Sequence, residues 1–295
     1  MYAIETEKIK KLLEEQNYVT DSEIVISVYM AKTLQKPLLI EGPAGVGKTE
    51  IAKVMSKAFN TDLIRLQCYE GIDANMAIYE WNYQRQLLHI KLEEHEKKSL
   101  SEREASIFSE EFLMKRPLLE AITHYKSPVL LIDELDRSDE EFESFLLEIL
   151  SEWQITIPEI GTILAKEKPY VILTSNRTRE LSEAIRRRCI FLWLDYPGFE
   201  KELQILQKKV PDCDINLTKQ ICNFMLLIRK KKLEKIPGIA ETIDWAKSLV
   251  ALHQDHLEPV MVEATLGIIF KDRDDVEHVR KSLKDLIESV GEKMK

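Results

Sequence analysis

The stretch Gly42-Pro43-Ala44-Gly45-Val46-Gly47-Lys48-Thr49 decides the fold of this chain. It fits the pattern GxxxxGK followed by Ser or Thr, in which glycines let successive backbone N–H groups converge on phosphate oxygens at the start of a helix. An apolar run, Pro37–Ile40, comes directly before it, and helical periodicity resumes at Ile51. A strand, a glycine loop and a helix in this order begin a βαβ unit, so we expect an α/β core with a parallel sheet.

The same loop predicts a nucleotide-binding site. Lys48 is expected to reach the β- and γ-phosphates of ATP, and the Thr49 hydroxyl is expected to hold Mg²⁺. A glycine turn with an accidental lysine is improbable here, because both the motif and its strand–loop–helix context match. The residues expected to bind the nucleotide or its metal are Gly42, Pro43, Ala44, Gly45, Val46, Gly47, Lys48, Thr49, Glu50 and Asp133.

Two adjacent carboxylates follow a second apolar run, Val129–Ile132. Asp133 is expected to complete the Mg²⁺ site, and Glu134 is expected to polarise the attacking water. An acidic pair at a strand end can also be purely structural, but the phosphate loop upstream favours catalysis. A GTPase would need an NKxD motif, and the stretch Ser175–Thr178 lacks that form. The sequence therefore predicts an NTPase that hydrolyses with water.

Two further stretches carry candidate catalytic residues. Asn176 follows the predicted strand Tyr170–Thr174, where its amide could hydrogen-bond both the γ-phosphate and the water; a turn asparagine is the structural alternative. Three consecutive arginines, Arg186, Arg187 and Arg188, precede the last predicted core strand. They form either a plain cationic loop or an arginine finger that acts on the ATP of a neighbouring subunit, a role that requires an oligomer.

Composition excludes several other classes of protein. The 295 residues carry a formal charge of −9, which disfavours non-specific nucleic-acid binding. The four cysteines show no CxxC spacing, so neither a zinc site nor a disulfide framework is expected. His253 and His256 are spaced i, i+3, and no metal site is expected from this pair. No window approaches 18 apolar residues, so we expect no membrane span and place the protein in the cytoplasm.

Periodicity predicts the remaining elements of the first part of the chain. We expect a strand at Asp62–Gln67, a solvated helical insertion over the charged residues 91–111, and a helix at Leu113–Ile122. A helix at Asp139–Trp153 should lead into a hairpin that turns at Gly161. The aromatic stretch 79–85 either packs against the core or faces a substrate, and packing is favoured for each aromatic taken separately.

The pattern changes after Gly198. Four helical segments are expected near 199–209, 216–232, 240–254 and 274–289, with no convincing strand among them. We therefore expect two domains, an α/β core at 1–198 and a small all-helical lid at 199–295. The basic run Arg229–Lys232 is expected to be a solvated helix face.

In combination, these motifs resemble those of AAA+ ATPases. The stretch IDELDRSDEEFESFLLEILSEWQITIP, with Arg137 after the acidic pair, resembles the MoxR family more closely. The stretches LIRLQCYEGIDANMAIYEWNYQRQLL, FLMKRPLLEAI and PGIAETIDWAKSL are similar to the branch found with molybdenum-containing CO dehydrogenases. The resemblance extends over nearly the whole chain.

This resemblance implies a Mg²⁺-dependent ATPase that assembles into a hexameric ring and remodels a client protein. The implied role is that of a chaperone in metalloenzyme maturation, with a von Willebrand factor A-domain protein as its partner. Among the arginines it favours Arg188 as the finger, with Arg186 and Arg187 as fallbacks. Many lids of this family carry a sensor arginine at the start of the third lid helix, but Thr242 occupies that position here.

Three alternatives stay open. The client could be a different enzyme, such as nitric-oxide reductase or Rubisco. The chain could act on DNA, like clamp loaders or branch-migration motors, although its charge and the lack of an attached DNA-binding domain disfavour this. It could also be a nucleotide-gated binding module with negligible turnover.

Overall fold

The computed structural model describes residues 2–92, 99 and 106–292. Its core is a five-stranded sheet with the strand order β2-β5-β8-β1-β9. The pairings β2–β5, β5–β8 and β8–β1 are parallel, and two antiparallel pairs, β3–β4 and β6–β7, lie outside this sheet. The strands are β1 (Leu38–Glu41), β2 (Leu63–Gln67), β3 (Tyr79–Trp81), β4 (Leu113–Lys115), β5 (Val129–Asp133), β6 (Gln154–Ile157), β7 (Gly161–Leu164), β8 (Tyr170–Ser175) and β9 (Ile190–Trp193).

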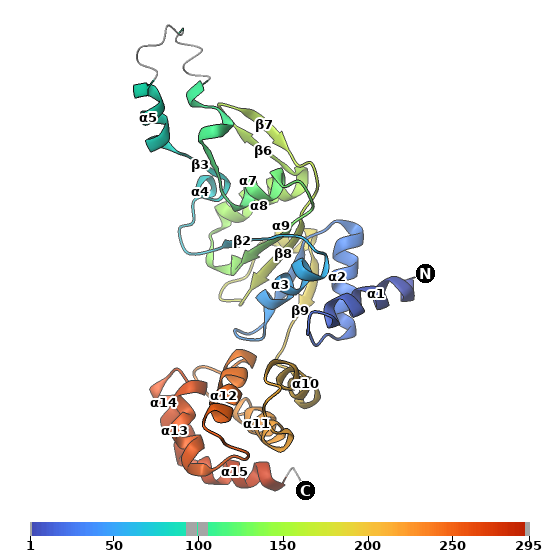
Figure 1. Cartoon of the computed structure of the whole chain (residues 1–295), viewed down its shortest axis with the longest axis vertical. Coiled ribbons are helices and arrows are strands. Elements are labelled where there is room, and N and C mark those ends of the chain that lie inside the picture. The colour runs from blue at the N-terminus through green and yellow to red at the C-terminus, as the bar shows by residue number, and fades with distance from the viewer. Residues whose placement is uncertain (1, 93–98, 100–105, 293–295) are drawn as a thin grey trace. The chain divides into compact units, whose positions relative to one another are not determined.

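Helices precede or follow most of these strands along the chain, whereas β6, β7 and β8 are consecutive (Figure 1). The strands β1 and β5 are buried throughout and, apart from the carboxylate that ends each of them, apolar, as expected of parallel strands covered on both faces. The predicted α/β, P-loop fold with a parallel sheet is thus confirmed. The helices are α1 (Tyr2–Glu14), α2 (Ser22–Leu34), α3 (Lys48–Ala58), α4 (Ala74–Ile78), α5 (Tyr83–Leu92), α7 (Pro117–Thr123), α8 (Glu140–Glu152) and α9 (Glu183–Arg188), with 3₁₀ turns η1 (Glu110–Phe112) and η2 (Leu135–Arg137).

The region after β9 is entirely helical among the described residues. Its six helices share one apolar core, in which Trp245 is fully buried and stacks at a tilt against Phe224. In Figure 1 they form one bundle coloured from brown to red. They are α10 (Phe199–Lys209), α11 (Ile215–Ile228), α12 (Ile239–Ala251), α13 (Pro259–Ile269), α14 (Arg273–Lys281) and α15 (Leu283–Glu292).

The chain divides into two compact units. The first contains residues 22–41 and 49–192 with the start of α1, and the second contains residues 10–21, 42–48 and those from 193 on. The phosphate loop therefore belongs, by its contacts, to the second unit, although the chain places it between β1 and α3. The two-domain division at 1–198 and 199–295 stays a prediction.

Several predicted elements are wrong in detail. The expected helix Leu113–Ile122 is a short strand, β4, followed by α7, because Leu113–Lys115 pairs with β3 and Pro117 begins the helix. The four expected helices after residue 198 are six, since α13 was missed and the segment 274–289 divides at Ser282 into α14 and α15. The predicted insertion at 91–111 falls largely on residues 93–98 and 100–105, outside the described residues.

Candidate functional site

The phosphate loop occupies Gly42–Gly47, between β1 and the first residue of α3. Gly45 and Gly47 have φ values of +77° and +95°, a region that L-residues avoid and that glycine adopts freely. The Lys48 side chain folds back on the loop, and its Nζ donates to the carbonyl oxygens of Gly42 and Pro43 at 2.8 and 2.7 Å. The strand, the loop and the helix thus follow one another as expected, and the binding of phosphate by the loop stays a prediction.

Two glycines of the loop also lie against backbone that follows β9 in the chain. A Cβ on Gly42 would lie 1.9 Å from the carbonyl oxygen of Leu194, and one on Gly45 would lie 3.1 Å from the Cα of Gly238. The Ile239 N–H donates to the Gly45 carbonyl at 2.9 Å. These contacts give the glycines a second reason to be present, which the sequence pattern does not reveal.

Asp133 ends β5 with its carboxylate almost fully buried. The Thr49 hydroxyl, at the start of α3, lies 3.1 and 3.2 Å from its two oxygens. The Thr174 hydroxyl donates to it at 2.5 Å, and the Arg65 guanidinium on β2 lies 2.6 Å away. The first unit thus brings together Thr49 and Asp133, the two residues expected to hold Mg²⁺.

Glu134 follows with φ +55°, a left-handed conformation that is unusual for a residue with a side chain. Its carboxylate accepts from the Gln67 amide at 3.2 Å and from the Asn176 amide at 3.4 Å, and it lies 3.1 Å from Nε of Arg137. The backbone turn separates its side chain from that of Asp133, as two carboxylates with different tasks require. Strained backbone of this kind is frequent at functional sites.

A third carboxylate, that of Asp136, also belongs to this part of the first unit and was not predicted from the sequence. It is buried and accepts from the backbone N–H groups of Asn176 and Thr178 and from the Thr178 hydroxyl, at 3.1, 2.9 and 2.7 Å. Burial by itself raises the pKa of Asp136, but the hydrogen bonds from Thr178 and Asn176 outweigh it, and the pKa is lowered overall. Asp136 thereby fixes the turn that presents Asn176 to Glu134.

The three candidate arginines lie on α9 and differ in their partners. Arg186 lies 3.9 Å from the buried carboxylate of Glu41, and Arg187 forms an exposed ion pair with Glu183 on the same helix. The Arg188 guanidinium donates to the Ala184 carbonyl at 3.2 Å, and the structure gives it no acidic partner among the described residues. Arg188 is thus exposed without an ion pair in this part of the chain.

The comparison with protein families identifies residues 37–189, just over half of the chain, as an AAA domain of the dynein-related subfamily. The chain belongs to this family. The matched range includes the phosphate loop, the acidic pair Asp133 and Glu134, and Asn176. The chain is accordingly an ATPase that hydrolyses ATP, and its nucleotide is expected to bind with Mg²⁺.

Proteins of lower identity match most of the chain. An uncharacterized protein, SH1500 of Staphylococcus haemolyticus (strain JCSC1435), is 22% identical over 281 residues, which are 93% of this chain and 98% of the relative. Two variants of the RuvB protein of Thermotoga maritima have a TM-score of 0.50 at 19% and 18% identity, covering 90% of this chain and 74% of theirs. These likenesses support the AAA fold.

The AAA site has the chemistry that Mg²⁺ requires. The ion prefers oxygen ligands and is commonly held by one or two protein oxygens together with water and phosphate oxygens. The Thr49 hydroxyl and the buried Asp133 carboxylate supply such oxygens. Arg65 already places a positive charge at the same carboxylate, which shows that this position favours a cation. Bound there, Mg²⁺ would neutralise charge on the phosphates.

One residue of the C-terminal helical region, Arg229, differs from expectation. Arg229 was expected on a solvated face, but its side chain is 6% exposed and forms an ion pair with Glu202, which is fully buried. Thr242, at the position of the sensor arginine, is fully buried as well. The prediction of a solvated basic run is therefore wrong for Arg229, because its partner is 27 residues away in the sequence.

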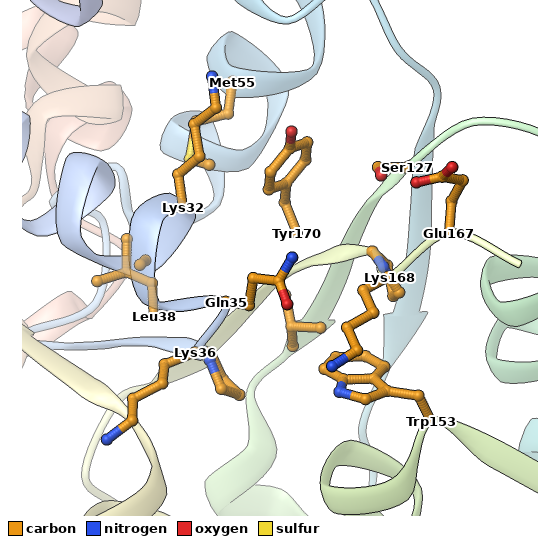
Figure 2. Close-up of a pocket in the computed structure, with 14 residues that line it drawn as sticks. Lys32, Gln35, Lys36, Leu38, Met55, Ser127, Trp153, Glu167, Lys168 and Tyr170 are labelled. Atoms are coloured by element: carbon orange, nitrogen blue, oxygen red, sulfur yellow. The ribbon is translucent and has the colours of Figure 1, made fainter. Parts of the chain in front are cut away.

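A separate pocket lies at the opposite edge of the sheet, where β1 and β8 begin (Figure 2). Trp153 and Met55 contribute apolar surface, Tyr170 stands at its centre in the view, and Lys36 and Lys168 lie at its rim. It contains none of the predicted site residues. Parallel strands place their carboxyl ends together at the other edge, so this pocket is distinct from the site at Asp133.

No helix among residues 2–92 and 106–292 is long and apolar enough to cross a membrane. Within the same described residues, no three His, Cys, Asp or Glu side chains gather in a way that could hold a metal ion. The Mg²⁺ proposed at Thr49 and Asp133 does not depend on such a cluster, because a hydroxyl, one carboxylate, water and phosphate oxygens supply its ligands.

Proposed function

We propose that this ATPase is a MoxR-type remodelling enzyme that acts as a hexameric ring on a client protein. The proposed context is metalloenzyme maturation, with a molybdenum-containing CO dehydrogenase as the model client and a von Willebrand factor A-domain protein as partner. The resemblance of residues 132–158 and of the C-terminal region supports this assignment. Ring assembly is common among AAA proteins and would supply the arginine finger.

One observation supports hydrolysis at this site most directly: Glu134 and Asn176 meet within 3.4 Å at the edge of the sheet where Thr49 and Asp133 also meet. In the proposed step, Glu134 accepts a proton from water while the water oxygen attacks the γ-phosphorus. The bond from the γ-phosphorus to the bridging oxygen breaks, so ADP and phosphate leave. Asn176 orients the water, and Lys48 and Arg188 stabilise the developing negative charge.

The decisive experiment uses Glu134→Gln. This variant keeps the size of the side chain but cannot accept the proton, so hydrolysis should fall by about 10² or more while ATP binding remains. Held in ATP, it is used to capture the client from extracts that contain the candidate metalloenzyme. Hydrolysis by the variant at the wild-type rate would reject the assigned mechanism. Negligible turnover by the assembled wild type would instead favour a nucleotide-gated binding module.

A DNA-acting motor is the competing class. The RuvB protein is described as a Holliday junction branch migration motor, but at 18–20% identity the likeness supports the fold alone. The formal charge of −9 disfavours DNA, and burial of Arg229 removes one cation from the basic run. Salt-sensitive stimulation of ATP hydrolysis by branched DNA would reverse this preference, whereas equal rates with and without DNA would support a protein client.

A further inference from the structure

A buried ion pair joins two helices of the C-terminal region. Glu202 on α10 is fully buried, and the Arg229 side chain at the end of α11 is 6% exposed. The guanidinium binds the carboxylate through two nitrogens, at 2.6 and 2.8 Å. Burying two charges costs desolvation energy that the pairing roughly offsets, so such a pair stabilises little and instead fixes a geometry.

The pair holds the start of α12. Nε of Arg229 donates to the Pro237 carbonyl at 3.0 Å, and a terminal nitrogen donates to the Thr242 hydroxyl at 3.0 Å. The same hydroxyl lies 2.8 Å from the Glu202 carboxylate and 3.1 Å from the Gly238 carbonyl. The side-chain hydrogen bonds of Glu202, Arg229 and Thr242 thus go either to one another or to the carbonyls of the turn Pro237–Gly238.

That turn lies directly against the phosphate loop. The Ile239 N–H donates to the Gly45 carbonyl at 2.9 Å. A Cβ on Gly238 would lie 2.5 Å from the Gly45 oxygen and 2.6 Å from its Cα, closer than real Cβ atoms approach. The contact therefore requires glycine at both position 45 and position 238. Any shift of the turn displaces the loop residue that it touches.

We infer that Glu202, Arg229 and Thr242 are positioning residues for the phosphate loop. They hold Pro237–Gly238 in place, and this turn holds Gly45 in its φ +77° conformation. The inference rests on the proposed binding of ATP phosphates by the loop. Thr242 is buried against Glu202, and the turn contacts the loop through the backbone of Gly238, Ile239 and Gly45. The positioning residues should therefore support the binding of ADP and ATP equally.

The first test introduces a methyl group at the contact. Gly238→Ala is expected to weaken binding of fluorescent ADP and ATP analogues to the full chain at least tenfold, and by the same factor for both. The matched control is Gly267→Ala on α13, where an added Cβ meets no atom within 4 Å, and it should bind as wild type does. Unchanged affinity of Gly238→Ala, or a loss confined to ATP, would overturn the inference.

The second test leaves the contact in place and alters what holds it. Arg229→Lys keeps the charge but loses the Nε donor to Pro237 and the two-nitrogen geometry. The double variant Glu202→Leu/Arg229→Met removes both charges at similar volume, which a merely structural pair tolerates. Both variants are expected to lose affinity for ADP and ATP three- to tenfold while circular dichroism shows the helices intact. If the double variant binds ADP and ATP with wild-type affinity, the ion pair has only a structural role.

These outcomes separate the inference from the proposed function. A wild-type chain that binds neither nucleotide would reject the proposed function itself. A wild-type chain that binds both, with variants that bind equally well, would reject the positioning role alone. Should Gly238→Ala unfold the helical region, the comparison of Arg229→Lys with wild type decides the question, because that substitution adds no atom at the contact.

Discussion

The Arg65 guanidinium lies 2.6 Å from the Asp133 carboxylate, at the position where the metal of the nucleotide is expected. Arg65 is half exposed on β2, whereas Asp133 is almost fully buried at the end of β5. The two strands are neighbours, and Arg65 stands two residues before the position paired with Asp133. The arginine and the Mg²⁺ ion would therefore compete for one carboxylate.

Removal of Arg65 should lower the Mg²⁺ requirement for nucleotide binding. Half-exposed ion pairs contribute up to about 1 kcal/mol, so Arg65→Ala is expected to lower the half-saturating Mg²⁺ concentration by up to about fivefold. Arg65→Lys should have a smaller effect. The half-saturating Mg²⁺ concentration is measured by titrating Mg²⁺ at a fixed concentration of fluorescent ADP. The charge-matched control is Arg280→Ala, which removes another half-exposed, ion-paired arginine. A higher requirement in Arg65→Ala would mean that Arg65 assists the metal.

Asp136 should affect catalysis without contacting the nucleotide. Asp136→Asn loses acceptors for Asn176 and Thr178, so Asn176 loses its orientation. We expect kcat to fall at least tenfold while nucleotide affinity changes less than twofold. Steady-state kinetics and binding titrations on the same preparation separate the two effects. An equal loss of affinity would indicate general damage to the site.

The lowered pKa of Asp136 predicts how its contribution to stability depends on pH. A carboxylate with a folded-state pKa below its ordinary 3.8 stabilises the fold above that pH. The contribution is lost as the pH falls through the folded-state pKa. The stability gap between wild type and Asp136→Asn, of about 1 to 3 kcal/mol, should therefore hold at neutral pH and shrink below 3.8. Urea unfolding across this range measures the gap, which should not widen in acid.

Arg188 should act on the site of a neighbouring subunit. Arg188→Ala alone is expected to lower hydrolysis by about a thousandfold. A Lys48→Ala subunit has a damaged site of its own but an intact Arg188, so mixing the two inactive variants should restore part of the activity. The ATPase rate of mixtures at several ratios tests this. Mixtures of Lys48→Ala with Arg188→Ala could instead stay inactive, while mixtures with Arg186→Ala or Arg187→Ala regain activity. The finger would then be the arginine replaced in the mixture that regains activity.

Two cysteines should resist alkylation in the folded chain. Burial raises the pKa of Cys68 to about 12, with a further contribution from the Asp133 charge, and burial raises that of Cys189 to about 12. At pH 8 about one thiol in ten thousand would then be ionised. Mass spectrometry after iodoacetamide treatment should find both cysteines unmodified in the native chain and modified in urea. Rapid native labelling would show that the strand ends open readily.

The parts of the fold that depend on local pattern could be predicted. The phosphate loop and its flanking strand and helix follow from residues adjacent in sequence, as does the hairpin that turns at Gly161. The strand Leu113–Lys115 could not be predicted, because its partner Tyr79–Trp81 lies more than 30 residues away. Helix α13 was missed because its sequence, PVMVEATLGII, is apolar on nearly all sides and lacks a clear period.

The candidate site divides in the same way. Asp133, Glu134 and Asn176 were predicted because each follows an apolar strand directly. Arg65 was not, since a charged residue in a half-buried strand ordinarily faces solvent. Arg229 was misassigned because its neighbours are lysines and its acidic partner is distant. Asp136 was not predicted either, because an aspartate within IDELD has no local feature that indicates burial.

Strand β8 lies between the strand that leads into the phosphate loop and the strand that ends at Asp133. Its residue Ile172 pairs with Leu38 on one side and with Leu131 on the other. Those two outer strands are therefore held about 10 Å apart, two strand widths. Adding or deleting one residue within 170–175 would reverse the side-chain alternation and displace Asn176. Length variation in relatives should accordingly fall in the connection at 165–169 and spare β8.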